Sequence, residues 1–133
     1  MAAKCRPQGV IAVKHCLVVD DSRLIRKVAA TILAEFAYES EEAEDGTQAL
    51  KACRARMPDL VLLDWNIPGT NVLEFLRGLR REPNGNLPFV LYCTTENDVG
   101  RIQEALVCGA NDYLLKPYDA PSLLERLSSA GLG

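Results

Sequence analysis

The sequence has few of the residues from which zinc centres, disulfide frameworks and serine-based catalytic sites are built. Its 133 residues include one histidine, His15, and an odd set of five cysteines, which never occur as C-x-x-C. The C-x-x-C spacing that is missing here is typical of zinc sites and redox motifs. The sequence also contains no G-x-S-x-G segment that could supply a serine nucleophile. We therefore expect neither a zinc centre nor a serine hydrolase. Cys16 and Cys93 lie inside apolar runs, where cysteine usually acts as a small buried hydrophobic residue.

The sequence also lacks an excess of positive charge and a long hydrophobic run. Its 15 Lys and Arg residues face 18 Asp and Glu residues, a formal net charge of −3, whereas a domain that binds nucleic acid through phosphates needs a basic face. No run approaches the roughly 20 apolar residues that span a bilayer, and residues 1–13 lack the apolar stretch of a signal peptide. We predict no nucleic-acid partner, no membrane span and a cytoplasmic location.

Composition and length are those of one folded domain. Hydrophobic residues make up 48% of the chain and charged residues 25%, which is ordinary for a globular protein, and the length suits one domain with a full core. We expect residues 1–133 to form a single domain with a flexible N-terminal extension over about residues 1–12 and a core over about residues 14–127. Because only residues 128–133 follow the last expected helix, no output domain is predicted.

Short apolar runs alternate with helix-like segments along the chain. Three runs are continuously apolar, as strands are when helices cover both faces of a parallel sheet; they are residues 16–19, 60–63 and 89–93. Two weaker strand candidates are Tyr38 to Ala43, polar enough for a sheet edge, and Asp112 to Leu115. The sequence therefore predicts five strands.

Helical periodicity follows each of these runs. It is clearest where Leu24, Val28 and Ile32 repeat at i, i+4 beside Ile25, Ala29, Leu33 and Phe36, and we expect that face to pack on the sheet. The last helix is expected behind an Asp119 cap, with Pro121 in its first turn. Five strand–helix units cannot close an eight-stranded barrel. The predicted fold class is therefore α/β, a doubly wound five-stranded parallel sheet with five helices on its two faces.

Polar side chains stand where the predicted strands end. These residues are Asp20 and Asp21 after the first strand, Asp64 at the end of the third, Thr94 after the fourth and Lys116 after the fifth. Ligands of such sheets bind at the carboxyl ends of the strands. Three carboxylates gathered there repel one another unless a cation intervenes, and an all-oxygen set without imidazole suits Mg²⁺. Sites of phosphoryl transfer combine a carboxylate, a divalent cation and a lysine in this way.

Each of these residues also has a purely structural interpretation. Asp21 or Ser22 could cap the helix that begins near Arg23. Asp64 could be a loop residue, Thr94 a cap or turn residue and Lys116 a solvated charge. Their joint occurrence at the ends of four separate strands favours the functional interpretation.

Four segments carry a resemblance to a known family. LVVDDS, LVLLDWNIPG, YCTTEND and YLLKPY resemble the receiver domain of two-component response regulators, and the similarity runs from about Lys14 to Leu127. The arrangement is most similar to single-domain chemotaxis regulators of the CheY type. The resemblance implies the flavodoxin-like strand order 2-1-3-4-5. It also implies a phosphoryl donor, either a sensor histidine kinase or a phosphotransfer protein.

The resemblance assigns roles to the residues at the strand ends. It implies that Asp64 accepts the phosphoryl group and that Asp20, Asp21, Asp64 and the backbone carbonyl of Asn66 hold Mg²⁺. Lys116 matches the lysine that pairs with the phosphoryl group, and its peptide bond to Pro117 is commonly cis in the family.

Further matches concern the response to phosphorylation. Thr94 resembles the switch hydroxyl, with Thr95 as a rival, and Tyr113 resembles the aromatic residue that moves inward, although a tyrosine there also has an ordinary packing role. Asn66 and Glu96 match positions that modulate the lifetime of the phosphoryl group. The implied output is protein binding at the face formed by the fourth helix, fifth strand and fifth helix.

One residue departs from the family pattern. Val72 stands where the family usually has glycine, and a β-branched residue adopts left-handed backbone angles only at high cost. We therefore expect the start of the third helix to be rearranged, with Gly69 supplying the missing backbone freedom.

The sequence thus predicts a phosphoacceptor response regulator that catalyses only its own phosphorylation and dephosphorylation. One alternative is a metal-dependent phosphatase that forms an aspartyl-phosphate, although enzymes of the haloacid dehalogenase type need a second aspartate where Asn66 stands. Another is an interaction module that works without phosphorylation. A nucleotide-binding domain is disfavoured because both G-x-G-x-x-G and the P-loop sequence are absent.

Overall fold

Five strands and five helices alternate along residues 14–95 and 99–132, the part of the chain that the computed structural model describes. The strands are β1 (Lys14–Val19), β2 (Tyr38–Ala43), β3 (Leu60–Asp64), β4 (Phe89–Thr94) and β5 (Asp112–Leu115). The helices are α1 (Arg23–Ala34), α2 (Gly46–Ala55), α3 (Val72–Arg81), α4 (Val99–Cys108) and α5 (Ala120–Ser129). The predicted N-terminal extension lies outside the described residues. None of the helices in the described part is long and apolar enough to cross a membrane.

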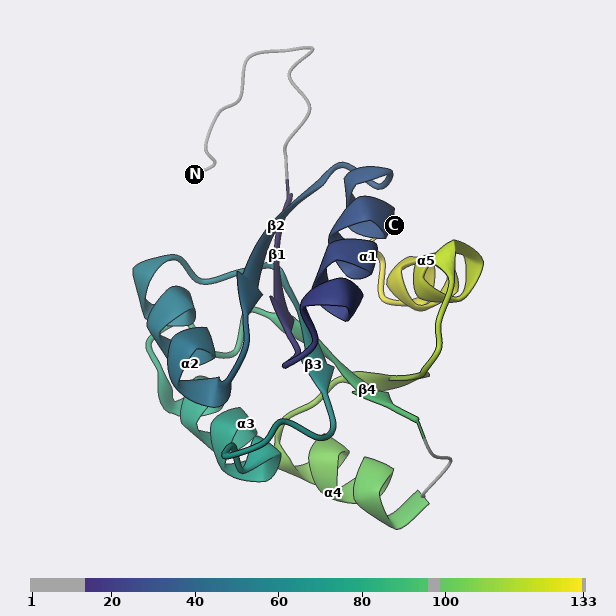
Figure 1. Ribbon diagram of the computed structural model, residues 1–133. Helices are drawn as coiled ribbons and strands as arrows, with labels where there is room; N and C mark the ends of the chain where they lie inside the picture. Colours follow the sequence, from purple (N-terminus) through teal and green to yellow (C-terminus); the bar gives the residue numbers. More distant parts are fainter. Residues whose placement is uncertain (1–13, 96–98, 133) are drawn as a thin grey trace.

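The strands form one parallel sheet in the order β2-β1-β3-β4-β5. Helices α1 and α5 cover one face, and α2, α3 and α4 cover the other (Figure 1). This confirms the predicted doubly wound α/β fold and its strand order. In the sheet register, Val19 of β1 lies beside Leu63 of β3, and Asp64 lies beside Cys93 of β4. The polar residues at the strand ends therefore share one rim of the sheet.

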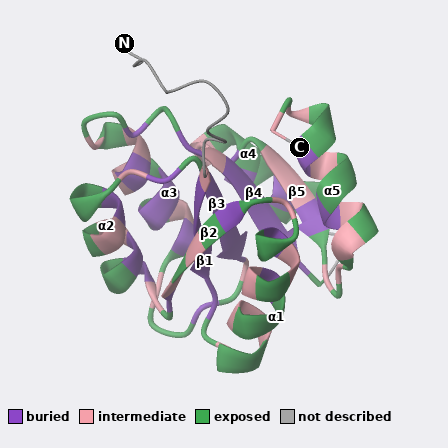
Figure 2. Ribbon diagram, turned by 90° about the horizontal axis from the view of Figure 1, so that it is seen from above, coloured by how far each residue is buried: buried purple, intermediate pink, exposed green. Residues whose placement is uncertain are grey.

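Alternate strand residues fill two hydrophobic layers. Leu17 and Val19 face the layer that includes Leu76 of α3, whereas Cys16 and Val18 face the layer that includes Leu123 of α5. Figure 2 shows the buried strands between helices whose outer faces are exposed. Cys16 and Cys93 are both buried free thiols, as predicted. The helices on both faces explain why the central strands read as continuous apolar runs.

The buried face of α1 is only part of the predicted one. Leu24 is 71% exposed and Val28 is 45% exposed, whereas Ala29 and Leu33 are fully buried. The apolar stripe that contacts the sheet therefore passes through Ala29 and Leu33. The predicted face was too wide because the two stripes of apolar residues lie next to each other in the helical period, about 100° apart. Only the direction of the sheet selects between them.

The start of α3 accommodates Val72 without a left-handed valine. Gly69, in the preceding loop, has φ +77°, a conformation that glycine adopts readily. Asn71 then caps the helix, because its side chain accepts a hydrogen bond from the backbone N–H of Glu74. Val72 is the first helical residue and is 8% exposed. Gly69 thus supplies the backbone freedom, as predicted.

Candidate functional site

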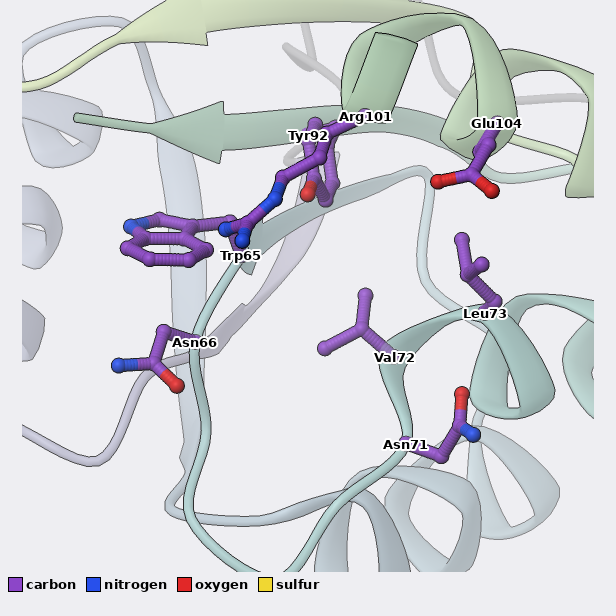
Figure 3. Close-up of a pocket in the computed structure, with 8 residues that line it drawn as sticks. All are labelled: Trp65, Asn66, Asn71, Val72, Leu73, Tyr92, Arg101 and Glu104. Atoms are coloured by element: carbon purple, nitrogen blue, oxygen red, sulfur yellow. The ribbon is translucent and has the colours of Figure 1, made fainter. Parts of the chain in front are cut away.

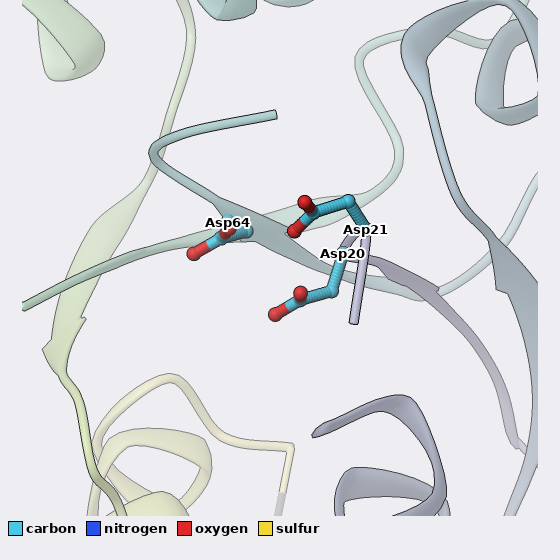
Figure 4. Close-up of side chains that lie close together, drawn as sticks. All are labelled: Asp20, Asp21 and Asp64. Atoms are coloured by element: carbon cyan, nitrogen blue, oxygen red, sulfur yellow. The ribbon is translucent and has the colours of Figure 1, made fainter. Parts of the chain in front are cut away.

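Three carboxylates meet at the rim of the sheet. Asp20 and Asp21 directly follow β1, and Asp64 is the last residue of β3. One carboxylate oxygen from each lies within 4.8 Å of the others, and Figure 4 shows the three side chains turned toward a common space. They meet because β1 and β3 are parallel neighbours. Asp20 and Asp64 are buried, and Asp21 is exposed.

Lys116 bridges the two buried acids. Its Nζ donates to Asp20 Oδ2 at 3.0 Å and to Asp64 Oδ1 at 2.9 Å, and its side chain is largely buried. The lysine follows β5, and its peptide bond to Pro117 is cis, as the resemblance implied. Lys116 also donates its backbone N–H to the carbonyl oxygen of Thr94 at 2.7 Å. The ends of four strands thus join in one polar cluster.

The electrostatics of this cluster follow from burial and crowding. Burial raises the pKa of Asp64, and the neighbouring charges of Asp20 and Asp21 raise it further, while the hydrogen bond from Lys116 acts in the opposite direction. Burial by itself would lower the pKa of Lys116, but its hydrogen bonds to Asp64 and Asp20 outweigh that effect and raise it. Lys116 is therefore a stable cation. One ammonium does not balance three carboxylates, so the site attracts a further positive charge.

The donor set fits a hard divalent cation. Within residues 14–95 and 99–132, the three aspartates are the group of acidic, histidine or cysteine side chains close enough to share a metal ion. All of their ligand atoms are carboxylate oxygens, which Mg²⁺ prefers over nitrogen and sulfur. Asn66, two residues after Asp64, is exposed in the loop after β3. The chemistry of these residues agrees with the predicted magnesium site.

The two predicted switch residues lie on neighbouring strands. Thr94 ends β4 with a buried side chain, whereas Thr95 is exposed. Tyr113 on β5 is half-buried, and the guanidinium of Arg126 lies 5.0 Å from the centre of its ring. This contact gives Tyr113 a packing partner on α5 in addition to its predicted role. Glu96 lies outside the described residues.

A cavity opens beside Asp64, between the loop after β3 and helix α4. Its volume is about 350 Å³. The residues that line it are Trp65, Asn66, Asn71, Val72, Leu73, Tyr92, Arg101 and Glu104 (Figure 3). The guanidinium of Arg101 lies over the ring of Trp65, 4.9 Å from its centre. Sequence reasoning missed Arg101 because no motif marks a cation–π pair between residues so far apart in the chain.

Comparison with known proteins decides the family. Residues 16–128 match the model of the response regulator receiver domain. The chain belongs to this family. Receiver domains are signalling modules of two-component systems and not classical enzymes, and they interact with histidine kinases or phosphotransfer proteins. The resemblance found in the sequence is therefore confirmed at the level of the family.

Relatives and solved structures agree with this assignment. The receiver domain is 38% identical over 117 residues to the phosphate regulon transcriptional regulatory protein PhoB of Pseudomonas aeruginosa, a match that covers 87% of this chain and 51% of PhoB. PhoB of Escherichia coli K12 is 32% identical with the same coverage. The chain thus spans about half the length of these relatives.

Among solved structures, chemotaxis response regulator CheY4 of Vibrio cholerae has a TM-score of 0.83 and 31% identity, covering 89% of this chain and 98% of that one. A CheY-like receiver domain from Methylobacillus flagellatus has a TM-score of 0.80 and 28% identity, covering 89% of this chain and 98% of that one.

Proposed function

We propose that Asp64 accepts a phosphoryl group from the phosphohistidine of a sensor histidine kinase or a phosphotransfer protein, in a reaction that depends on Mg²⁺. One observation carries this proposal. The Asp64 carboxylate is buried among two other acids and the ammonium of Lys116, so a nucleophile, a cation site and a fixed positive charge occupy the same rim.

The chemistry needs one bond to form and one to break. An oxygen of Asp64 attacks phosphorus, and the bond between phosphorus and the imidazole nitrogen breaks, with the electron pair of the broken bond staying on that nitrogen. Because the other ring nitrogen of the phosphohistidine carries a proton, the leaving group is a neutral imidazole. Hydrolysis by water later returns the carboxylate and inorganic phosphate. Lys116, already 2.9 Å from Asp64 Oδ1, is placed to neutralise a phosphoryl oxygen.

The metal site would draw on the same rim. Asp20, Asp21 and Asp64 would hold Mg²⁺ through their carboxylates, and Asn66 through its backbone carbonyl. Bound Mg²⁺ supplies charge neutralisation for the phosphoryl oxygens as they move. Asn66 is exposed beside the acceptor, where its side chain can influence the water that hydrolyses the phosphoryl group; we propose the same role for Glu96.

The signal would pass from the rim to a protein-binding face. A phosphoryl group adds about −1.5 to −2 charge at Asp64, which attracts Lys116 and the hydroxyl of Thr94, and Tyr113 then follows Thr94 inward. The elements α4, β5 and α5 expose several large apolar side chains outside the groove against α3, which support a role in protein binding; they are Val99, Leu106, Leu115 and Leu124.

A small phosphodonor tests the acceptor directly. With acetyl phosphate and Mg²⁺, intact mass should show one phosphoryl group per chain, and Asp64→Asn should abolish it. Asp59→Asn is a matched control, because Asp59 lies at the opposite end of β3 and bonds the backbone N–H of His15; this variant should be labelled like the parent. Retention of the label after Asp64→Asn would refute the proposal.

The same assay separates the two alternatives. Release of many phosphates per chain would favour the metal-dependent phosphatase. The phosphorylation-independent interaction module would be favoured by two results together. Acetyl phosphate would not label the parent chain, and a beryllofluoride mimic would not change its Trp65 fluorescence.

A further inference from the structure

Arg26 of α1 reaches the main chain of the acidic cluster. Its Nη1 donates to the backbone carbonyl oxygen of Asp20 at 2.7 Å, and its Nε donates to Glu42 Oε1 on β2 at 2.9 Å. The Arg26 side chain is only 12% exposed, so this is not an ordinary surface ion pair. A largely buried guanidinium therefore ties the end of β1 to the end of β2.

The other polar groups of Asp20 are held from different directions. Its N–H donates to the carbonyl oxygen of Ala43 at 3.1 Å. Its carboxylate accepts from the Ser22 N–H at 2.9 Å and from Lys116. Arg26 adds the contact to the carbonyl oxygen, which completes the set. Glu42 and Ala43 are consecutive residues of β2. The N–H of Asp20 therefore bonds this stretch of β2 directly, and its carbonyl oxygen is connected to the same stretch through Arg26.

The carbonyl that Arg26 holds belongs to the peptide between Asp20 and Asp21. A peptide unit is planar and rigid, so fixing its oxygen fixes the directions in which the chain leaves toward both aspartates. Resting on the proposed function, we propose that Arg26 is a positioning residue for the cation site. It holds the peptide between Asp20 and Asp21 so that their carboxylates keep the arrangement that binds a divalent cation.

Charge and position make opposite predictions for this arginine. If Arg26 acted only through its positive charge, removing it would make the site more negative and tighten Mg²⁺ binding. If Arg26 acts by positioning, removing it loosens the carboxylates and weakens Mg²⁺ binding, as loss of a residue that orients metal ligands does. The sign of the change in affinity therefore distinguishes the two.

Lys27 provides the matched control. Its Nζ donates to the other oxygen of the Glu42 carboxylate at 2.9 Å, but its side chain is 59% exposed and its contact is with Glu42 rather than with the Asp20 carbonyl. Lys27→Gln removes the same charge from the adjacent residue of the same helix. It leaves the Arg26 contact to Asp20 in place.

The experiment is a titration of the full chain with MgCl₂, followed by calorimetry and by Trp65 fluorescence. Arg26→Gln should weaken Mg²⁺ binding by about tenfold, whereas Lys27→Gln should leave it unchanged or slightly tighter. Arg26→Lys should fall between the parent and Arg26→Gln, because one ammonium does not reproduce the guanidinium fork. Labelling of Arg26→Gln by acetyl phosphate should recover as the Mg²⁺ concentration rises.

Several outcomes would overturn the inference. Mg²⁺ binding by Arg26→Gln that matches or exceeds that of Lys27→Gln would refute positioning while leaving the proposed function intact. A parent that neither binds Mg²⁺ nor is labelled would refute both. If Arg26→Gln fails to fold by circular dichroism, Glu42→Gln replaces it, with Glu41→Gln as its control of equal charge. Positioning requires Glu42→Gln to weaken binding more than Glu41→Gln, since Glu41 lies beside His15 rather than Arg26.

Discussion

Asp64 combines two properties that oppose each other. The burial and the neighbouring charges that make its carboxylate a confined nucleophile also raise its pKa. In the folded chain the ionised form of this side chain is therefore less stable than it is in the unfolded chain. The stability contributed by Asp64 is fully present below its ordinary pKa of 3.8, and it is lost as the pH rises through the higher folded value.

We expect Asp64→Asn to be more stable than the parent at pH 7. The amide removes a buried charge and its repulsion with Asp20 and Asp21, while Lys116 keeps its bond to Asp20. A gain of about 1 kcal/mol corresponds to a rise in Tm of about 4 °C for a chain of this size. Calorimetric unfolding without Mg²⁺ measures it. A lower Tm for Asp64→Asn would mean that the ion pair with Lys116 outweighs the burial of the carboxylate.

The strand-end residues were predictable, and the two arginines were not. Apolar runs locate the strands, and parallel strands bring their carboxyl ends together, so Asp20, Asp64 and Lys116 could be placed on one rim from the sequence alone. Arg26 and Arg101 act through contacts with residues on other elements. An arginine on an amphipathic helix can remain in solvent, form a surface ion pair or pack against another element. The sequence does not distinguish these possibilities.

Helix α4 has a smaller buried face than its neighbour α3. It buries Ile102 and Ala105, while Val99 and Val107 are mostly exposed. Arg101 of α4 contacts the ring of Trp65, the residue that follows the acceptor Asp64. This contact gives α4 a link to the end of β3 that is separate from Thr94.

We expect Arg101→Ala to loosen α4 and to change the emission of Trp65. The lost cation–π contact is worth about 0.5–1 kcal/mol, so amide hydrogen exchange over residues 99–108 should become a few times faster. Arg101→Lys, which keeps a cation near the ring, should be intermediate. Hydrogen exchange measured by mass spectrometry checks this, and unchanged exchange in Arg101→Ala would show that α4 is held by its buried residues alone.

For helices, the sequence located the segments better than their faces. The caps of α1, α3 and α5 are short polar side chains directly before the helical period, and the Asp119 cap was predicted from this pattern. The sequence did not separate the buried stripe of α1 from the exposed stripe beside it, because Leu24 and Val28 repeat with the same spacing as Ala29 and Leu33. Only packing against β1 and β2 distinguishes the two stripes.

In the molecule as a whole, the unbalanced negative charge at the rim should couple cation binding to stability. A ligand that binds only the folded chain stabilises it by about 1.4 kcal/mol at ten times its Kd. We therefore expect MgCl₂ to raise the Tm of the parent by several degrees. The rise should be much smaller in Asp20→Asn, which lacks one of the buried carboxylates. An equal rise in both chains would indicate a general salt effect rather than a site.

The open edge of the sheet at β2 has a consequence of its own. This strand carries three glutamates, Glu39, Glu41 and Glu42, and among the described strands it pairs only with β1 (Figure 1). An unprotected edge offers backbone donors and acceptors to the same strand of another molecule, and charged side chains on it oppose such pairing. Glu42 is paired with Arg26 and Lys27, and Glu39 with Arg56, so charged side chains of both signs line this edge. When two copies approach through their β2 strands, pairing would have to desolvate these charges, which opposes edge-to-edge self-association.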